Sequence, residues 1–107
     1  MTQTVLEELV ATIANRRKAD GAQSYTRSLL DGGTEKCAKK FGEEAVELII
    51  AALGDDDSAT KGEAADVLYH LLVLLEARGI AFQSVLDELA SRQGVSGHAE
   101  KAARTNQ

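Results

Sequence analysis

The sequence predicts an all-α fold, a small bundle of four to five helices. The 107 residues include no Pro, only two Phe and two Tyr, and many Ala, Leu, Glu and Lys, a composition that favours helix over sheet. Apolar residues also recur at spacings of three and four along most of the chain. This length supports one hydrophobic core, so we expect a single domain spanning residues 1–107.

Charge and hydropathy exclude several classes of protein. The net charge of −5 argues against a nucleic-acid binder, which needs a basic surface to meet phosphates. The longest apolar run, residues 67–75, is interrupted by Tyr69 and His70 and is far too short to cross a membrane. The single cysteine excludes an intramolecular disulfide, and no signal peptide opens the chain. We therefore expect a cytoplasmic protein with no membrane partner.

Two segments are expected before the first double glycine. Helical spacing of apolar residues from Thr4 to Lys18 predicts an amphipathic helix. The basic triplet 16–18 either complements the negative end of the helix dipole or contacts a phosphate. Residues 24–30 predict a connector with one short helical turn. Its hydroxyls and Arg27 suit a loop that closes over a polar ligand.

A long helix is expected next, capped by Thr34 and running to about Leu53. We interpret Cys37 as a small hydrophobe of its core face, because no helix start would activate its thiol as a nucleophile. The predicted buried stripe has the spacing of one helix face and comprises Cys37, Phe41, Ala45, Leu48, Ile49 and Ala52.

The following turn, residues 54–58, places acids at the positive start of a helix from about Ala59 to Arg78. Thr60 and Glu63 also fit a capping box, which would give Glu63 a structural role. Within this helix, residues 67–75 are apolar on nearly every side and must be covered on every side. A single small chain cannot supply that cover, so we expect a homodimer or a higher homo-oligomer.

A last amphipathic helix is expected after Gly79, with Phe82, Val85, Leu86 and Leu89 on its apolar face. A short basic tail follows. The role of its His98, Lys101 and Arg104 stays open.

Two pairs of carboxylates are the main functional signal. Glu44 with Glu47, and Glu63 with Asp66, have i, i+3 spacing, so each pair lies on one helix face. If the two helices are antiparallel neighbours, all four acids meet at a similar depth below the turn. Four converging carboxylates would repel one another without a cation, whereas Mg²⁺ prefers such oxygen ligands. The sequence therefore predicts a metal site.

Other charged residues surround these acids. Lys36, Lys39 and Lys40 precede them on the same helix, either as a solvated face with i, i+4 ion pairs or as cations for a polyphosphate beside the metal. His70 lies four residues after Asp66, on the acid face. It is either a core residue whose ring nitrogens are hydrogen-bonded or a donor of a hydrogen bond to a ligating carboxylate.

These acid pairs resemble the signature of the all-α nucleoside-triphosphate pyrophosphatases, which hold Mg²⁺ with four such side chains. More of the chain resembles one branch, the phosphoribosyl-ATP pyrophosphohydrolases of histidine biosynthesis. The resembling stretches span nearly the whole chain and are Ser24-Tyr25-Thr26, Leu29-Leu30, Gly32-Gly33, Lys36, Lys39-Lys40, residues 42–45, residues 65–74, Ser96-Gly97 and residues 100–102. In the tail, His98 stands where the family has an aliphatic residue.

The resemblance implies hydrolysis of N1-(5-phosphoribosyl)-ATP to the corresponding AMP compound and pyrophosphate. Mg²⁺ on the four acids would neutralise the triphosphate, and a carboxylate would accept a proton from the attacking water. The roles to assign are a general base, Glu43 or Glu47; metal ligands, Glu44, Glu47, Glu63 and Asp66; and phosphate contacts, Lys36, Lys39, Lys40, Arg16 and Arg27.

Two alternatives come from other classes. A housekeeping pyrophosphatase for ordinary or damaged nucleotides would use the same acids without needing residues 24–26 or the tail. A non-enzymatic helical dimerisation module would explain the leucine-rich helix and leave the acids as surface charge.

Overall fold

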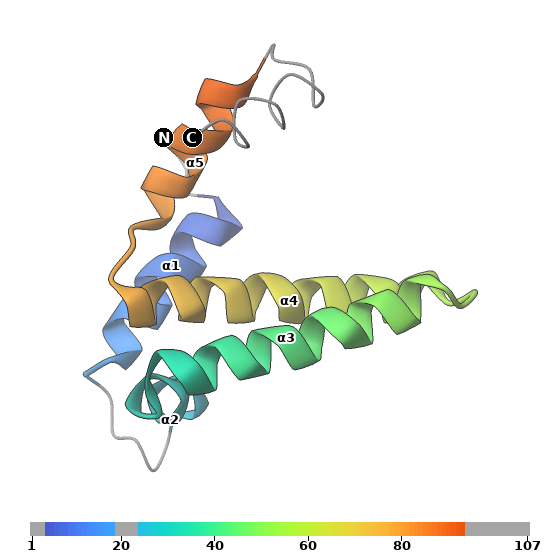
Figure 1. The fold of residues 1–107 in the computed structure, drawn as a ribbon, viewed down its shortest axis with the longest axis horizontal. Coiled ribbons are helices and arrows are strands. Elements are labelled where there is room, and N and C mark those ends of the chain that lie inside the picture. Colours follow the sequence, from blue (N-terminus) through green and yellow to red (C-terminus); the bar gives the residue numbers. More distant parts are fainter. Residues whose placement is uncertain (1–3, 19–23, 94–107) are drawn as a thin grey trace, which may run out of the picture.

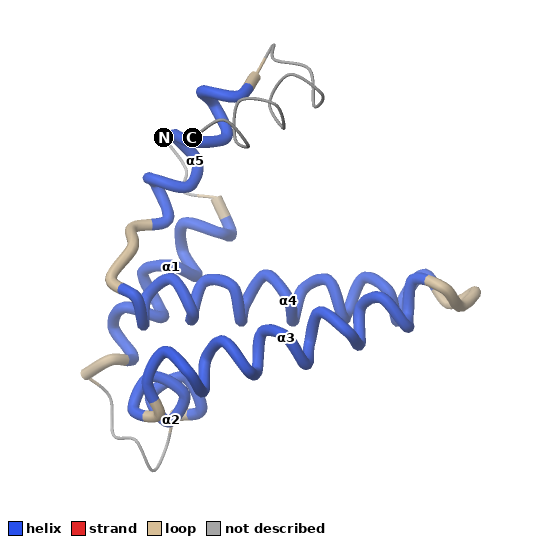
Figure 2. Tube along the Cα trace, viewed as in Figure 1, coloured by secondary structure: helices blue, strands red, loops and turns tan. Residues whose placement is uncertain are grey.

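A computed structural model describes residues 4–18 and 24–93 (Figure 1). The described residues form helices joined by short loops and contain no strand, which confirms the all-α prediction (Figure 2). Among them, no helix has the length and apolar content needed to span a membrane. The helices are α1 (Val5–Arg16), α2 (Tyr25–Asp31), α3 (Gly33–Ala52), α4 (Asp57–Arg78) and α5 (Phe82–Arg92).

Helices α3 and α4 form an antiparallel hairpin around which the other helices are placed (Figure 1). The turn lies at one end of the hairpin, where α3 and α4 stand alone (Figure 1). Helices α1 and α2 pack at the other end, and α5 leads away from it (Figure 1). The predicted pair of antiparallel central helices is therefore present.

The hydrophobic core lies at the covered end of the hairpin. Each of the first four helices contributes to it, through Ile13, Leu29, Cys37, Leu72 and Val73, all nearly inaccessible to solvent. Cys37 is the small core residue that the sequence predicts, and its thiol donates a hydrogen bond to the Leu29 carbonyl at 3.2 Å. Burial raises the pKa of this thiol, so the neutral form is favoured.

The other end of the hairpin exposes apolar side chains. On α3, the exposed residues Ile49 and Ala52 show that the predicted buried stripe is wrong beyond Leu48. Only α4 packs on this part of α3, because α1 and α2 reach no further than the first half (Figure 1). Likewise Leu68 is 45% exposed, so one copy of the chain does not cover α4 on every side.

The expected connector before α3 is a helix. Ser24 caps α2, and its side chain accepts a hydrogen bond from the Arg27 backbone N–H at 3.1 Å. Only Gly32 separates α2 from α3, so α3 begins at Gly33 and no side chain caps it, contrary to the prediction for Thr34. Gly33 has φ of 82°, a backbone conformation that favours glycine.

The N-terminal cap of α4 decides between two interpretations of the sequence, an acid of the turn or a capping box of Thr60 with Glu63. The Asp56 carboxylate accepts from the backbone N–H groups of Ser58 at 2.9 Å and Ala59 at 3.2 Å. The Thr60 hydroxyl instead donates to the Ala51 carbonyl, so the capping box with Glu63 does not form. Glu63 is thereby left available for another role. At the far end, Gly79 in the left-handed region closes α4.

We expect Asp56→Ala to lower the free energy of unfolding by about 1 kcal/mol, because two backbone N–H groups lose their acceptor. Urea denaturation at one fixed protein concentration measures this. Asp55→Ala is the matched control, since Asp55 is an exposed acid of the same turn with no cap bond. Equal losses in the two variants would contradict the capping role.

Candidate metal centre

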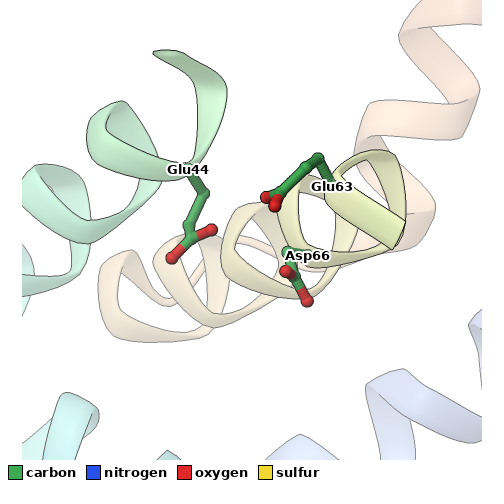
Figure 3. Close-up of side chains that lie close together, drawn as sticks. All are labelled: Glu44, Glu63 and Asp66. Atoms are coloured by element: carbon green, nitrogen blue, oxygen red, sulfur yellow. The ribbon is translucent and has the colours of Figure 1, made fainter. Parts of the chain in front are cut away.

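Three carboxylates from α3 and α4 meet in the middle of the hairpin. Glu44 projects from α3 towards Glu63 and Asp66 of α4 (Figure 3). Each residue offers one oxygen, and these oxygens all lie within 4.8 Å of one another. The antiparallel packing thus brings together three of the four acids that the sequence places at a metal site.

Glu47, the fourth acid, is exposed and adjoins this cluster. The pKa of Glu44 is raised, first by burial and then by hydrogen bonding and charge repulsion with Glu47. The pKa of Glu63 is also raised, first by burial and then by the charges of Glu47 and Asp66. Proton binding to Glu44 and Glu63 is therefore favoured while no cation offsets the repulsion.

One oxygen of the cluster lacks a partner. Glu63 Oε2 is buried and accepts no hydrogen bond from any described residue. A buried polar atom left without a partner is unfavourable, so such atoms are rare in native structures. A cation between the three carboxylates would satisfy it, and carboxylate oxygens are the ligands that Mg²⁺ prefers. The residues present therefore fit a magnesium ion.

The lysines expected to contact phosphates lie earlier on α3 or at its start. Lys40 Nζ is 3.3 Å from Glu43 Oε2, an i, i+3 ion pair in place of the i, i+4 pairs considered from the sequence. Lys36 Nζ donates to the Ser28 carbonyl at 3.5 Å. Lys39 is exposed. None of the three offers its ammonium group to the Glu63 oxygen that lacks a partner.

The two arginines considered as phosphate contacts differ. Arg27 forms an ion pair with Asp31, with Nε 2.8 Å from Oδ1, and donates to the Arg17 carbonyl at 3.0 Å. Arg16 is exposed at the end of α1. Its neighbour Arg17, of the same basic triplet, fastens α1 to α4 by binding both the carboxylate and the carbonyl of Glu76, a contact that sequence reasoning missed. No sequence signal distinguishes Arg17 from Arg16, because Glu76 is a distant residue.

His70 is buried and bridges α2 and α4. Its Nδ1 is 2.9 Å from the backbone carbonyl of Asp66, which can only accept, so Nδ1 carries a proton and donates. Of the two alternatives for His70, the structure shows the core residue with both ring nitrogens hydrogen-bonded, because the i, i+4 position lays the ring over the main chain of the previous turn. The Tyr25 hydroxyl lies 3.3 Å from Nε2 and donates to it when His70 is neutral.

The hydroxyl groups of residues 24–26 all bind the protein. Ser24 caps α2, Tyr25 is hydrogen-bonded to His70, and Thr26 shares a hydrogen bond with the Tyr69 hydroxyl. Sequence reasoning placed these residues in a loop that suits a polar ligand. The structure places them at the start of helix α2, which their side chains fasten to the part of α4 that follows the acids.

A family model described as "Phosphoribosyl-ATP pyrophosphohydrolase" matches residues 6–93. The chain belongs to the phosphoribosyl-ATP pyrophosphohydrolase family. This membership makes it a hydrolase, and the resemblance seen in the sequence is confirmed. The helices that carry the acids and their supporting contacts lie within the matched region.

Curated relatives of the family align with almost the whole chain. A protein named phosphoribosyl-ATP pyrophosphatase from Ruegeria sp. (strain TM1040) is 55% identical, over 94% of this chain and 96% of its own length. Proteins of the same name from Dinoroseobacter shibae and Zymomonas mobilis are 57% and 52% identical. The alignments cover 94% and 97% of this chain, and 99% and 97% of those proteins.

The raised pKa values predict how pH and Mg²⁺ act together on stability. A carboxyl group with a raised pKa in the folded state stabilises the fold below its unfolded pKa, near 4.5, and this contribution is lost as the pH rises through the folded value. We expect Mg²⁺ to raise the melting temperature by several degrees more at about pH 7.5 than at about pH 5, because protons occupy the cluster at low pH. Differential scanning fluorimetry measures both gains.

Glu63→Gln is the variant that checks this interpretation. It should reduce both the gain in melting temperature from Mg²⁺ and its dependence on pH, since it removes one of the charges that repel. Asp87→Asn, an exposed acid on α5, should leave both unchanged. An equal gain at the two pH values in the unmodified protein would contradict proton occupancy of the cluster.

Proposed function

We propose that this chain hydrolyses N1-(5-phosphoribosyl)-ATP to N1-(5-phosphoribosyl)-AMP and pyrophosphate, the second step of histidine biosynthesis. The observation that carries the proposal is the cluster of Glu44, Glu63 and Asp66, which could hold a cation and includes a buried oxygen without a hydrogen-bond partner. The names of the relatives, which align over nearly their full length, supply the substrate.

We propose Mg²⁺ as the cofactor, held by Glu44, Glu63 and Asp66 with Glu47 beside them. When bound there, the ion would neutralise charge on the triphosphate and orient it for attack. The protein's own contribution is to hold carboxylates on two packed helices, so that the ligands are positioned before the substrate arrives.

A general base must accept a proton from the attacking water, and Glu43 and Glu47 are the two candidates. Glu43 is paired with Lys40, whereas Glu47 is exposed and adjoins Glu44 and Glu63 at the cluster. A carboxylate that borders the ligands without being one of the three clustered groups is placed to accept the proton of a water attacking beside them. We therefore favour Glu47 as the base.

Cations along α3 are proposed to stabilise the group that leaves. Lys36, Lys39 and Lys40 precede the acids on the same helix and would contact the departing pyrophosphate. The exposed Arg16 is proposed to bind the phosphate at the other end of the substrate. Arg27 would have to release Asp31 to do the same, so we place it second.

The strongest alternative is a pyrophosphatase acting on ordinary nucleoside triphosphates, which would use the same acids. The tripeptide 24–26 does not exclude it, because these hydroxyls have structural partners. The names of the relatives favour phosphoribosyl-ATP. The non-enzymatic module is excluded by membership in a family of hydrolases.

We expect one pyrophosphate per turnover and no free phosphate, because several cations suit a leaving pyrophosphate better than a single phosphate. Hydrolysis of phosphoribosyl-ATP in ¹⁸O-water, with and without Mg²⁺, tests this by mass spectrometry of both products. Label in the monophosphate product supports attack on the α-phosphorus. Label in the pyrophosphate, or stepwise release of phosphate, would overturn it.

The same assay on a panel of substrates that includes ATP separates the two kinds of pyrophosphatase. Faster hydrolysis of ATP than of phosphoribosyl-ATP would favour the alternative.

Asp66→Asn should reduce turnover at least about 100-fold while the far-UV circular dichroism is kept, because the amide preserves the shape but not the charge. Asp87→Asn again serves as the control.

We also propose that a second copy of the chain covers the open end of the hairpin. The apolar residues left exposed there are Val46, Ile49, Ile50 and Leu53 of α3, at 54%, 59%, 65% and 84% exposure. Such a patch on two unsupported helices is typical of an interface between subunits.

We also propose that the chain is a single-domain enzyme that acts in the cytoplasm, because its proposed substrate is a metabolite of amino-acid biosynthesis.

Sedimentation at micromolar concentration should show a dimer or a larger homo-oligomer and no monomer. Ile50→Glu should shift the protein towards monomer, because it places a charge in the apolar patch. Val5→Glu is the matched control, since Val5 is a 79% exposed valine on α1, away from the patch. A stable monomer of the unmodified chain would remove this proposal.

A further inference from the structure

Tyr25 is exposed although its position is fixed. Its side chain is anchored through the hydroxyl, which binds the buried His70, and His70 in turn is anchored to the Asp66 carbonyl. The ring lies nearly parallel to that of Tyr69, with centroids 6.4 Å apart and planes at 18°, and meets the His70 ring edge-on. Even so, 55% of Tyr25 is open to solvent.

Charged groups lie near both tyrosines and near the histidine that holds Tyr25. Lys40 is a neighbour of Tyr25, and its pKa is raised first by Glu43 and next by the Tyr25 phenol. Burial raises the pKa of Tyr69, and the neighbouring Arg16 opposes this rise. His70 ties Tyr25 to the main chain of Asp66, one of the three clustered acids.

We propose that Tyr25 binds the purine base of the substrate by stacking. The inference rests on the proposed function, because phosphoribosyl-ATP carries its base between two phosphate-bearing ends. With the triphosphate at the acids and lysines, the base that it carries would meet the exposed Tyr25 ring, which His70 ties to the main chain of Asp66. Exposed aromatic rings are common platforms for bases, since every base offers a π face.

The hydrogen bond to His70 favours this role over a contact with phosphate. A tyrosine hydroxyl has one proton, and a neutral His70 that carries its own proton on Nδ1 takes it at Nε2, so none remains for a phosphate oxygen. The same bond and the Tyr69 ring hold Tyr25 in one orientation before a ligand arrives. Little side-chain entropy is then lost on binding, which strengthens the stacking contact.

Kinetics of phosphoribosyl-ATP hydrolysis separate this role from a purely structural one. We expect Tyr25→Leu to raise KM about tenfold with kcat within about threefold, because the base loses its platform while the acids are untouched. Tyr25→Phe keeps the ring and should raise KM less than about threefold. An unchanged KM in Tyr25→Leu, or an equal KM in Phe and Leu variants, would overturn the proposal.

A binding measurement on the unmodified protein does not depend on turnover or on the variants folding. The sequence has two tyrosines and no tryptophan, so the Tyr25 ring protons can be assigned by NMR with a Tyr69→Phe variant. With Mg²⁺ present, AMP should shift these protons upfield and ribose 5-phosphate should not. No shift with AMP would overturn the proposal, as would an AMP shift matched by ribose 5-phosphate.

The two experiments also distinguish this inference from the proposed function. If phosphoribosyl-ATP is not hydrolysed but AMP shifts the Tyr25 protons, the proposed function fails and base stacking stands. If the unmodified protein hydrolyses phosphoribosyl-ATP, but Tyr25→Leu leaves KM unchanged and AMP does not shift the Tyr25 ring protons, the proposed function stands and the inference fails. Dissociation of the oligomer in Tyr25→Leu without a change in KM would assign the ring to an interface, which also overturns it.

Discussion

Repulsion between carboxylates that α3 and α4 bring together is the constraint on which the rest of this structure depends. Glu44, Glu63 and Asp66 place oxygens within 4.8 Å of one another, and the raised pKa values of Glu44 and Glu63 reflect burial and this crowding. Such an arrangement opposes the packing of the two helices. Other contacts must hold the hairpin closed until a cation or protons remove the repulsion.

Those contacts lie mostly away from the acids. The core unites α1, α2, α3 and α4 at one end of the hairpin, and Asp56 and Thr60 fix the turn at the other. Between them, α2 binds the turn of α4 that follows the acids, through Tyr25 and Thr26. The acid cluster is therefore held from both ends, with no polar partner from the described chain for the buried Glu63 oxygen.

The position of the core at one end of the hairpin also explains the exposed apolar surface at the other end. Helices α1 and α2 are short and pack beside the first half of α3, where the core is (Figure 1). The second half of α3 has only α4 as a neighbour, so Ile50 and Leu53 remain exposed in one copy. A second copy would both bury this surface and add support to the hairpin beyond the acids. Stability and the site would then be coupled through the oligomer.

Much of the fold follows from local sequence patterns. Helical periodicity, the absence of proline and the i, i+3 spacing of the acids are local properties, so they predict the helices, the hairpin and the convergence of Glu44 with Glu63 and Asp66. The core position of Cys37 is predicted for the same reason.

Only the tertiary structure decides which polar groups pair and which apolar groups stay uncovered. The Tyr25–His70 bond joins residues 45 positions apart, and Arg17 reaches Glu76 across 59 positions, distances over which spacing carries no signal. The Thr60 hydroxyl donates to the Ala51 carbonyl across the turn and does not form a capping box with Glu63. The spacing of Thr60 and Glu63 in the sequence fits that capping box, so only the structure excludes it. Ile49 and Ala52 share the spacing of Cys37, yet they are exposed because no third helix reaches them.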